Sequence, residues 1–534
     1  MIKKTIKLED TNYFSSLMLD YINGKNELKS FYTRFPDQDS YLIQAQEKLE
    51  NFSNRKILLE AISNQLSGLD LSQKQINNLN LLKQENTVTI TTGHQLNLFT
   101  GPIFFFYKIL QVIKQCNELN HLQNNINFVP IFWMATEDHD FEEINHFNFK
   151  NLVIHWDKEH GGPVGQLTTE GLKDVFSSFL SILPNGKKKD KLKSLIEKSY
   201  FLDTSLTNAT RILVNELFKE YGLLIVDGDD KSLKETMIPI FKKELVNNVA
   251  FNTVEKQANE LIKAGYSVQV NPREINLFYI ANPLSRERIV FENGLYHILN
   301  TSISFTKDEI LTELNNNPEK FSPNVILRPL YQENILPNVA YIGGGGEIAY
   351  WFELNKMFKE YGVTFPLLVL RNSMLIRTEK QERKQKKLGL SDKDLFKSSR
   401  DIIKKDVIEN SNLLNEVPNL ENQLKSIFIE LDKLAKDTES SFSEMVQAQK
   451  TKQLKGFEKL KKRLINAEIK KNENLQLRIE NLLKELNQNK GLQERKTNFS
   501  DFEYVDLDKF INSIYQEIKP FDFNFVINTL DESI

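Results

Sequence analysis

The sequence predicts an α/β fold with a parallel-sheet core, inserted connecting modules and a long antiparallel helical coiled coil. Two strand–helix–strand units, at residues 87–146 and 321–373, and a heptad repeat within residues 375–490 lead to this prediction. Strand–helix–strand crossovers build parallel sheets, whereas heptads of apolar residues are typical of coiled coils. We expect a core over 1–374 with an insertion at about 235–320, a coiled coil over 375–490, and a C-terminal segment over 491–534 that returns to the core.

The composition is that of a globular protein with more than one domain. At 534 residues, the chain is too long for a single hydrophobic core. Its net charge of −3 argues against general nucleic-acid binding, and its single cysteine suits a reducing compartment. The first residues lack the apolar segment of a signal peptide, and no run of about 18 apolar residues could span a membrane. We therefore expect a cytoplasmic protein without nucleic-acid or membrane partners.

In the first unit, polar residues follow both strands. Residues 87–92 and 128–135 are apolar or β-branched runs of strand type, and a helix begins near Pro102 between them. His94 and Gln95 come just after the first run, and residues 136–140 come just after the second. Ligands of open parallel sheets bind outside the carboxyl ends of the strands. We expect both polar turns to face one crevice.

The second unit carries four consecutive glycines, residues 343–346, between a strand and a helix. Such a turn lets the backbone approach a ligand, and the helix N-terminus favours an anion. The turn matches neither the dinucleotide-binding pattern nor the P-loop, so a tight turn without a ligand is the alternative. Arg328 and Arg371 are expected near the same edge of the sheet.

Three other segments are interpreted from their patterns. Residues 152–156 are expected to form a third strand of the core, and residues 222–227 another strand after a helix. The inserted module is expected to contain short strands at 267–270, 277–280 and 289–291. We interpret its Arg286 and Arg288 as solvated surface residues, with contact to an anion as the alternative.

The heptad segment predicts a helical hairpin. Leu420, Leu424, Ile427, Leu431 and Leu434 are spaced 4-3-4-3, as coiled-coil seams are. On the later arm, the apolar register shifts between Ala467 and Leu475, which indicates a local irregularity.

The clustered histidines and acids are compatible with several kinds of function. A carboxylate can position or deprotonate an amine while His or Gln stabilises an oxyanion, which favours a ligase. A histidine after a strand also suits a class I nucleotidyltransferase-like enzyme acting on another small substrate, although the His-x-Gly-His signature is absent. A metal site at residues 138–146 lacks a standard ligand spacing, and a non-enzymatic coiled-coil scaffold leaves the clustering unexplained.

Four blocks of the sequence resemble a known family. They read TGHQLNLFTGPIFFFYKI, VPIFWMATEDHDFEEINH, SPNVILRPLYQENILPNVAYIGGGGEIAYW and GLQERKTNF, and they resemble the BshC family of bacillithiol-biosynthesis cysteine-adding enzymes in order along the chain. The resemblance implies a cytosolic ligase that joins L-cysteine to the amine of glucosaminyl-malate. It also implies a Rossmann-like core and a coiled coil that pairs two subunits into a homodimer.

The resemblance and the turns together assign the candidate residues. Glutamine often stands in that family where this chain has His94, so His94 is expected to be a hydrogen-bonding contact rather than a base. The expected catalytic residues are Glu137, Asp138, His139 and Asp140. The expected substrate-binding residues are His94, Gln95, Asn97, Asn324, Arg328, Gly344, Gly345, Glu347 and Tyr350, with no metal.

A carboxylate and an amine do not condense in water without activation of the carboxylate. We therefore expect ATP or ADP as the cofactor, with ATP activating the cysteine carboxylate as an adenylate or acyl phosphate. The glycine turn motivates this expectation.

Overall fold

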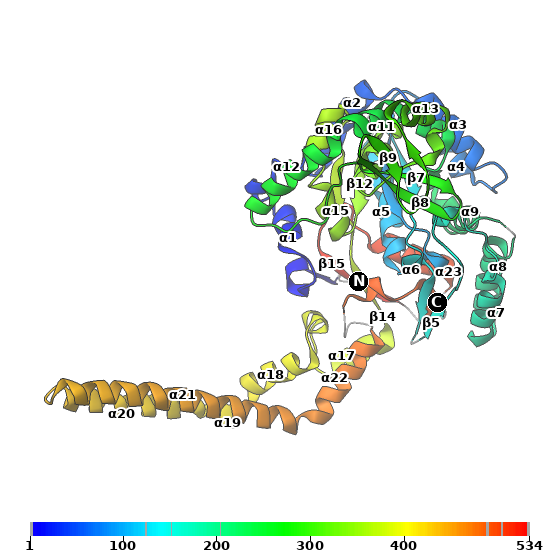
Figure 1. Ribbon diagram of the computed structural model, residues 1–534. Helices are drawn as coiled ribbons and strands as arrows, with labels where there is room; N and C mark the ends of the chain where they lie inside the picture. The colour runs from blue at the N-terminus through cyan, green and yellow to red at the C-terminus, as the bar shows by residue number, and fades with distance from the viewer. Residues whose placement is uncertain are drawn as a thin grey trace. The chain divides into compact units, whose positions relative to one another are not determined.

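The computed structural model describes residues 4–122, 125–150, 152–202, 204–486, 491–502 and 506–530. It divides into a first unit, residues 1–375 with 494–534, and a second unit, residues 376–493. Figure 1 shows the elements of both units.

The first unit is built on a five-stranded parallel sheet, which confirms the predicted fold class. Its order is β13-β12-β2-β3-β6, and every neighbouring pair is parallel. The strands are β2 (Thr87–His94), β3 (Asn127–Met134), β6 (Leu224–Asp227), β12 (Asn338–Gly343) and β13 (Leu367–Leu370). Nearly every residue in them is buried, as expected for strands covered on both faces.

Helices from distant parts of the sequence pack on this sheet. The crossover helix α5 (Phe104–Asn120) contacts β2, β3 and β12, and α2 (Gln38–Asn51) contacts β2 and β12. Cys116 of α5 is buried in a cluster with Val88, Phe128 and Val369, and it acts there as a small apolar side chain. The other main helices of the first unit outside the inserted region are α1 (Ser16–Ile22), α3 (Arg55–Gln65), α4 (Gln73–Leu82), α7 (Leu172–Ile182), α8 (Lys187–Tyr200), α9 (Leu206–Phe218), α14 (Leu327–Ile335), α15 (Gly345–Trp351), α16 (Asn355–Tyr361) and α23 (Leu507–Glu517).

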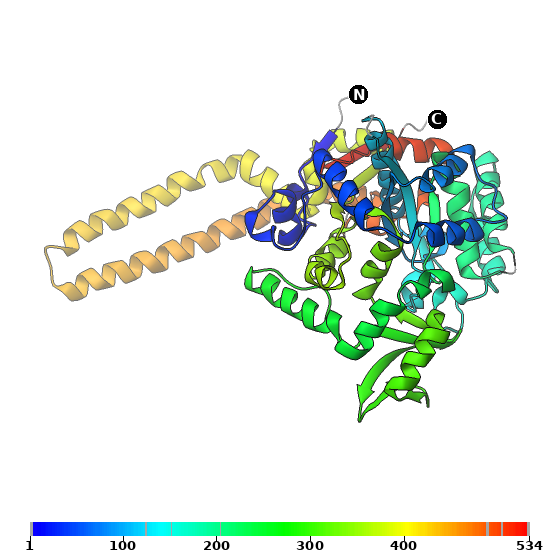
Figure 2. The same ribbon diagram turned by 90° about the horizontal axis from the view of Figure 1, so that it is seen from above.

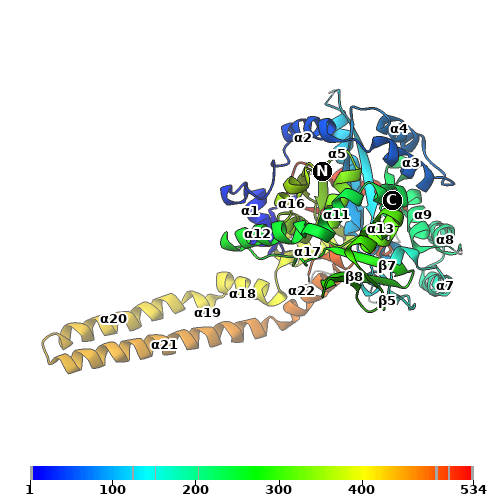
Figure 3. The same ribbon diagram turned by 45° about the horizontal axis from the view of Figure 1, so that its top comes forward.

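The inserted region is an antiparallel sheet with helices (Figure 3). Its order is β10-β9-β8-β7-β11. Asn293 and Gly294 turn β8 into β9 with φ of 52° and 83°, the left-handed conformation that a tight hairpin needs. The elements are α10 (Lys231–Glu235), α11 (Ile238–Asn247), α12 (Val249–Lys263), β7 (Leu277–Asn282), β8 (Ser285–Glu292), β9 (Leu295–Ile298), β10 (Ser304–Phe305), α13 (Lys307–Asn316) and β11 (Phe321–Pro323).

One predicted strand lies in another sheet, and one is absent. Residues 152–156 do not join the parallel sheet, because β6 occupies the position next to β3. Instead β5 (Leu152–His155), which is largely exposed, pairs antiparallel with β4 (His146–Phe149). Residues 267–270 form no strand, and the Gln269 amide donates to the carboxylate of Glu353 at 2.6 Å rather than to a neighbouring strand.

A third sheet has the order β1-β15-β14. It joins β1 (Lys4–Ile6) and β15 (Phe525–Leu530) in antiparallel register, from opposite ends of the chain. The chain passes from the first unit into the second within β14 (Met374–Thr378).

The second unit contains the predicted helical hairpin (Figure 2). Its arms are α20 (Val417–Ala435) and α21 (Ser440–Lys471), and α22 (Glu473–Glu485) follows after a break at Asn472, between the two apolar registers. Phe428, Ala435 and Val446 form the buried seam together with Leu424 and Leu431. The other helices are α17 (Glu379–Lys387), α18 (Ser399–Asn410) and α19 (Asn412–Asn415).

A buried ion pair connects α2 with α14 in the first unit. Lys48 Nζ lies 3.9 Å from Glu333 Oε2 and donates to the main-chain oxygen of Glu333 at 2.6 Å. Glu333 Oε1 accepts from Asn338 Nδ2 at 2.7 Å, inside the sheet. Burial raises the pKa of Glu333 to about 7, although the charge of Lys48 opposes this.

We predict that Lys48→Met destabilises the first unit more at high pH than at low pH. The folded-state pKa of Glu333 lies above its unfolded value, so stability is lost as pH rises through the folded value. Without Lys48 the carboxylate has no counter-charge, and the loss reaches about 3 kcal/mol near pH 8. Thermal melting at about pH 5 and about pH 8 measures this. Lys48→Met/Glu333→Gln is expected to recover most of the loss, and equal losses at both pH values would contradict the prediction.

Candidate active site

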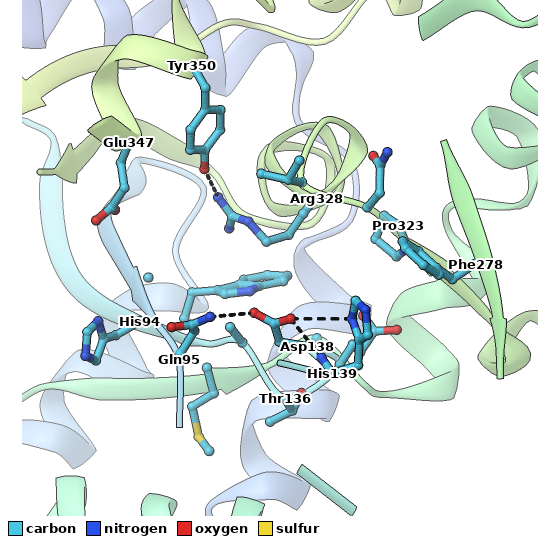
Figure 4. A pocket seen from close by; sticks show the side chains of 18 of the residues that line it. His94, Gln95, Thr136, Asp138, His139, Phe278, Pro323, Arg328, Glu347 and Tyr350 are labelled. Atoms are coloured by element: carbon cyan, nitrogen blue, oxygen red, sulfur yellow. Dashed lines mark hydrogen bonds and ion pairs between the residues drawn. The ribbon is translucent and has the colours of Figure 1, made fainter. Parts of the chain in front are cut away.

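The carboxyl ends of the parallel strands open onto one cavity of about 620 Å³. His94 at the end of β2 is paired with Met134 at the end of β3, so the two polar turns that follow lie side by side. Nine predicted residues line this cavity together: His94, Gln95, Glu137, Asp138, His139, Asn324, Arg328, Glu347 and Tyr350. Figure 4 shows the two polar turns that follow β2 and β3 facing Arg328, Glu347 and Tyr350.

Four predicted site residues make other contacts and do not line the cavity. Asn97 donates to the main-chain oxygen of Glu143 at 3.0 Å. Asp140 accepts from the Glu143 amide and caps the short helix α6 (Phe141–Ile144). Gly344 and Gly345 begin α15, and a Cβ on Gly345 would lie 3.3 Å from Met18. The glycine turn therefore lies outside the lining of this cavity, and its role in binding an anion stays a prediction.

Asp138 is an acid of the cavity that is accessible and has no lysine or arginine partner among the described residues. Its Oδ2 accepts from Gln95 Nε2 at 2.8 Å, and its Oδ1 accepts from the His139 amide at 2.7 Å. The side chain is 33% exposed. Among the residues that the structure describes, no Lys or Arg lies within ion-pair distance of it. Gln95 also donates to Glu143 Oε2 at 2.7 Å, so the orientation of its amide is held from two sides.

Glu137, in contrast, is held in a buried ion pair. Its carboxylate lies 2.6 Å from Lys234 Nζ, and the same ammonium contacts Asp229 at 2.9 Å. Burial raises the pKa of Glu137, while Lys234 opposes this effect. The pair leaves Glu137 poorly placed to exchange protons with a ligand. Sequence patterns missed Lys234, which comes from α10, outside both strand–helix–strand units.

Both histidines of the site have a lowered pKa. The ring of His94 lies 5.3 Å from Phe104 and 5.2 Å from Phe105. Burial, and then the charges of Lys108 and Arg371, lower its pKa well below the ordinary value. This agrees with a contact rather than a base. Burial and the neighbouring Arg286 lower the pKa of His139 as well.

Arg286 is buried at the cavity wall, which corrects its interpretation as a solvated surface residue. It is 7% exposed, and one of its nitrogens lies 2.9 Å from His139 Nδ1. The alternation of β8 turns its side chain toward β11 and the site. The sequence pattern of a short strand could not show which neighbour that face would meet.

The opposite wall is organised by Lys108 of α5. This buried ammonium donates to both carboxylate oxygens of Glu347, at 2.8 and 2.9 Å, and to the main-chain oxygen of Gly93 at 2.6 Å. The Tyr341 hydroxyl donates to the same carboxylate at 2.8 Å. Burial alone would raise the pKa of Glu347, but Lys108 lowers it overall. Lys108 was not among the residues predicted from the sequence, although a single lysine within the apolar run FFFYKIL is a signal that could have found it.

Arginines bring positive charge to the cavity. Arg328 donates to the Tyr350 hydroxyl at 3.1 Å and to Gln332 at 3.1 Å. Arg273 and Arg288 also line the cavity, and their guanidinium groups have no partner among the described residues. Asn324 accepts from the amides of residues 326 and 327 at the start of α14, so its carbonyl is already used.

The described residues contain no group of three or more His, Cys, Asp or Glu side chains arranged to hold a metal ion. No helix within the described ranges is long and apolar enough to cross a membrane.

Comparisons with known proteins cover nearly the whole chain. The N-terminal Rossmann-like domain of the bacillithiol-biosynthesis protein BshC matches residues 1–372, and the C-terminal coiled-coil domain of BshC matches residues 374–530. Relatives from Flavobacterium johnsoniae, Flavobacterium psychrophilum and Christiangramia forsetii are 47%, 46% and 44% identical. Each match covers 98% of this chain and 98 to 99% of the relative, and each relative is named "Putative cysteine ligase BshC". The chain belongs to the BshC family of bacillithiol biosynthesis.

Proposed function

We propose that the protein is a ligase that forms an amide bond between the carboxyl group of L-cysteine and the amine of glucosaminyl-malate. Family membership over the whole length supports a ligase. The observation that carries the chemistry is a cavity with an accessible carboxylate, Asp138, on one wall and guanidinium groups on the other. Such a cavity suits a substrate that has both an amine and carboxylates.

Asp138 is the proposed partner of the amine. A carboxylate can hold an ammonium group and accept its proton as the nitrogen attacks. Gln95 donates to Oδ2 and the His139 amide donates to Oδ1, so the carboxylate is held in one orientation. Of the three acids predicted as catalytic, Asp138 alone lines the cavity without a lysine partner or a helix-capping contact.

The arginines are the proposed contacts of the anionic part of the substrate. Guanidinium groups bind carboxylates in a fixed fork geometry. Arg273 and Arg288 have no partner among the described residues, and Arg328 lies beside Tyr350 on the same cavity. These groups would hold the malate carboxylates.

Activation of the cysteine carboxylate is the proposed task of ATP. The nucleotide would supply a leaving group, which a free carboxylate lacks. The arginines fit a phosphate as well as a carboxylate. The glycine turn lies outside the cavity lining, so the proposal no longer rests on it.

Asp138→Asn is expected to lower the rate of product formation by roughly 10²-fold or more, because the amide cannot accept a proton from the amine. Mass spectrometry of the thiol product measures the rate, and circular dichroism checks the fold. Glu142→Gln, an exposed neutral substitution in the following short helix, is the matched control. Near-normal turnover of Asp138→Asn would refute the assignment.

Purified protein with L-cysteine and glucosaminyl-malate is expected to form product only when ATP is added. One nucleotide should be consumed for each amide formed, because one carboxylate is activated for each bond. Chromatography of the nucleotides and of the product gives the ratio. Product formed without nucleotide consumption would remove ATP from the proposal.

We also propose that the helical hairpin pairs two subunits. Leu420, Ile427 and Leu434 recur every seven residues on α20 and are 50%, 54% and 65% exposed. They form an apolar stripe beside the buried seam of the hairpin. An apolar stripe with this spacing is typical of a face that packs against another helix.

Ile427→Asp is expected to convert the dimer to a monomer, since it places a charge in the middle of the stripe. Sedimentation velocity measures the mass in solution. Ser426→Asp adds the same charge at the neighbouring exposed position, outside the stripe, and should leave the mass unchanged. A dimer of Ile427→Asp that is as stable as the original would exclude this interface.

A further inference from the structure

Arg286 is fixed by contacts to all three of its nitrogens. Nε donates to Ser322 Oγ at 2.9 Å, and one terminal nitrogen donates to the main-chain oxygen of Pro323 at 3.0 Å. The other terminal nitrogen lies 2.9 Å from His139 Nδ1. The guanidinium also lies over the ring of Phe278, 4.0 Å from its centroid. Arg286 is therefore a rigid donor rather than a free anion-binding group.

This contact determines the tautomer of His139. An arginine side chain only donates hydrogen bonds and stays protonated in proteins, so Nδ1 must accept. The proton of the neutral ring then resides on Nε2. Asp138 Oδ1 lies 3.7 Å from Nδ1, and an ion pair there requires a protonated ring. Protonation would break the bond to Arg286 and set two cations 2.9 Å apart, which disfavours it.

Some charges around His139 favour protonation of its ring, and others oppose it. Asp138 and Asp140 from its own turn, and Glu287 from β8, favour the charged ring, whereas burial and Arg286 disfavour it more strongly. Within the described part of the chain, Nε2 has no hydrogen-bond partner, and the side chain is about half exposed on the cavity. The available N–H therefore belongs to a neutral imidazole.

We propose that Arg286 is a positioning residue that keeps His139 neutral, with its proton on Nε2, as a hydrogen-bond donor to the reacting carboxyl oxygen. The proposal rests on the proposed ligase function. In the amide-forming step, the amine nitrogen bonds to the carboxyl carbon and the C=O electron pair moves to oxygen. That electron pair re-forms the C=O bond as phosphate or AMP leaves with the pair of the broken C–O bond, and Asp138 takes the amine proton. Nε2–H stabilises the oxygen and keeps its proton.

The same geometry excludes His139 as the general base. The lone pair of Nδ1 is directed at Arg286, and Nε2 has none to offer while it is protonated. The two neighbouring residues thus have different roles, with proton acceptance at Asp138 and hydrogen-bond donation at His139.

The titration of His139 tests the role of Arg286 in the free protein. Hydrogen–deuterium exchange at the imidazole C2 carbon, followed by mass spectrometry of peptides, gives a midpoint for each histidine. The midpoint of His139 is expected below about 6.5 in the original protein. Arg286→Met is expected to raise it by about 1 pH unit, because a nearby positive charge is removed. Arg288→Met, two residues further on β8, should leave it unchanged.

A midpoint of His139 at or above about 6.5 in the original protein would overturn the proposal, and this measurement needs no variant to fold. An unchanged midpoint in folded Arg286→Met would also overturn it. Nitrogen-15 chemical shifts of labelled histidine give the tautomer independently. A neutral ring protonated at Nδ1 would overturn the proposal.

Activity measurements test the donor role. Glutamine can turn its carbonyl toward Arg286 and its amide N–H toward the cavity, whereas alanine supplies neither. The kcat of His139→Gln is expected to be at least about tenfold higher than that of His139→Ala. Equal losses would refute donation by His139. If the original protein forms no amide, the proposed function and the donor role both fail, while the titration still decides whether Arg286 controls His139.

Discussion

The five strands of the central sheet run in one direction, and this places their carboxyl ends along a single edge. Hydrogen bonds between strands use the backbone within the sheet, so the chain beyond the last paired residue is free to present side chains to a ligand. His94 and Asp138 reach the same cavity for this reason. The antiparallel inserted region covers the edge and contributes Phe278 and Arg286. The cavity lies between these two sheets.

Desolvation decides which charged groups in the cavity are available for chemistry. Removing a charge from water is costly unless an opposite charge lies close by. Glu347 meets this requirement for the buried Lys108, and Lys234 meets it for Glu137. Asp138 keeps partial contact with solvent and needs no such partner. Glu137 and Asp138 therefore differ in their availability for chemistry because of their neighbours, since both side chains are carboxylates.

The sequence alone predicted those features that local patterns determine. Apolar runs with polar residues after them located the strand ends, and heptads located the hairpin, because these signals lie within a few residues. The partners of the site residues come from elsewhere. Lys234 is distant in sequence from Glu137, and Arg286 lies on a short strand whose two faces look alike in sequence. The composition of the glycine turn likewise does not say which way its backbone faces, and the turn lies outside the cavity lining.

The contact between Arg286 and His139 joins the two sheets of the first unit. Arg286 belongs to β8 and is held by Ser322 and Pro323 of β11, whereas His139 follows β3 of the parallel sheet. The antiparallel sheet alone can orient the guanidinium, and the parallel sheet alone can place the imidazole, but neither by itself selects the tautomer. The protonation state of His139 is thus a property of the packing between the two sheets. A substitution that loosens this packing should change the titration of His139 even when it touches no ligand.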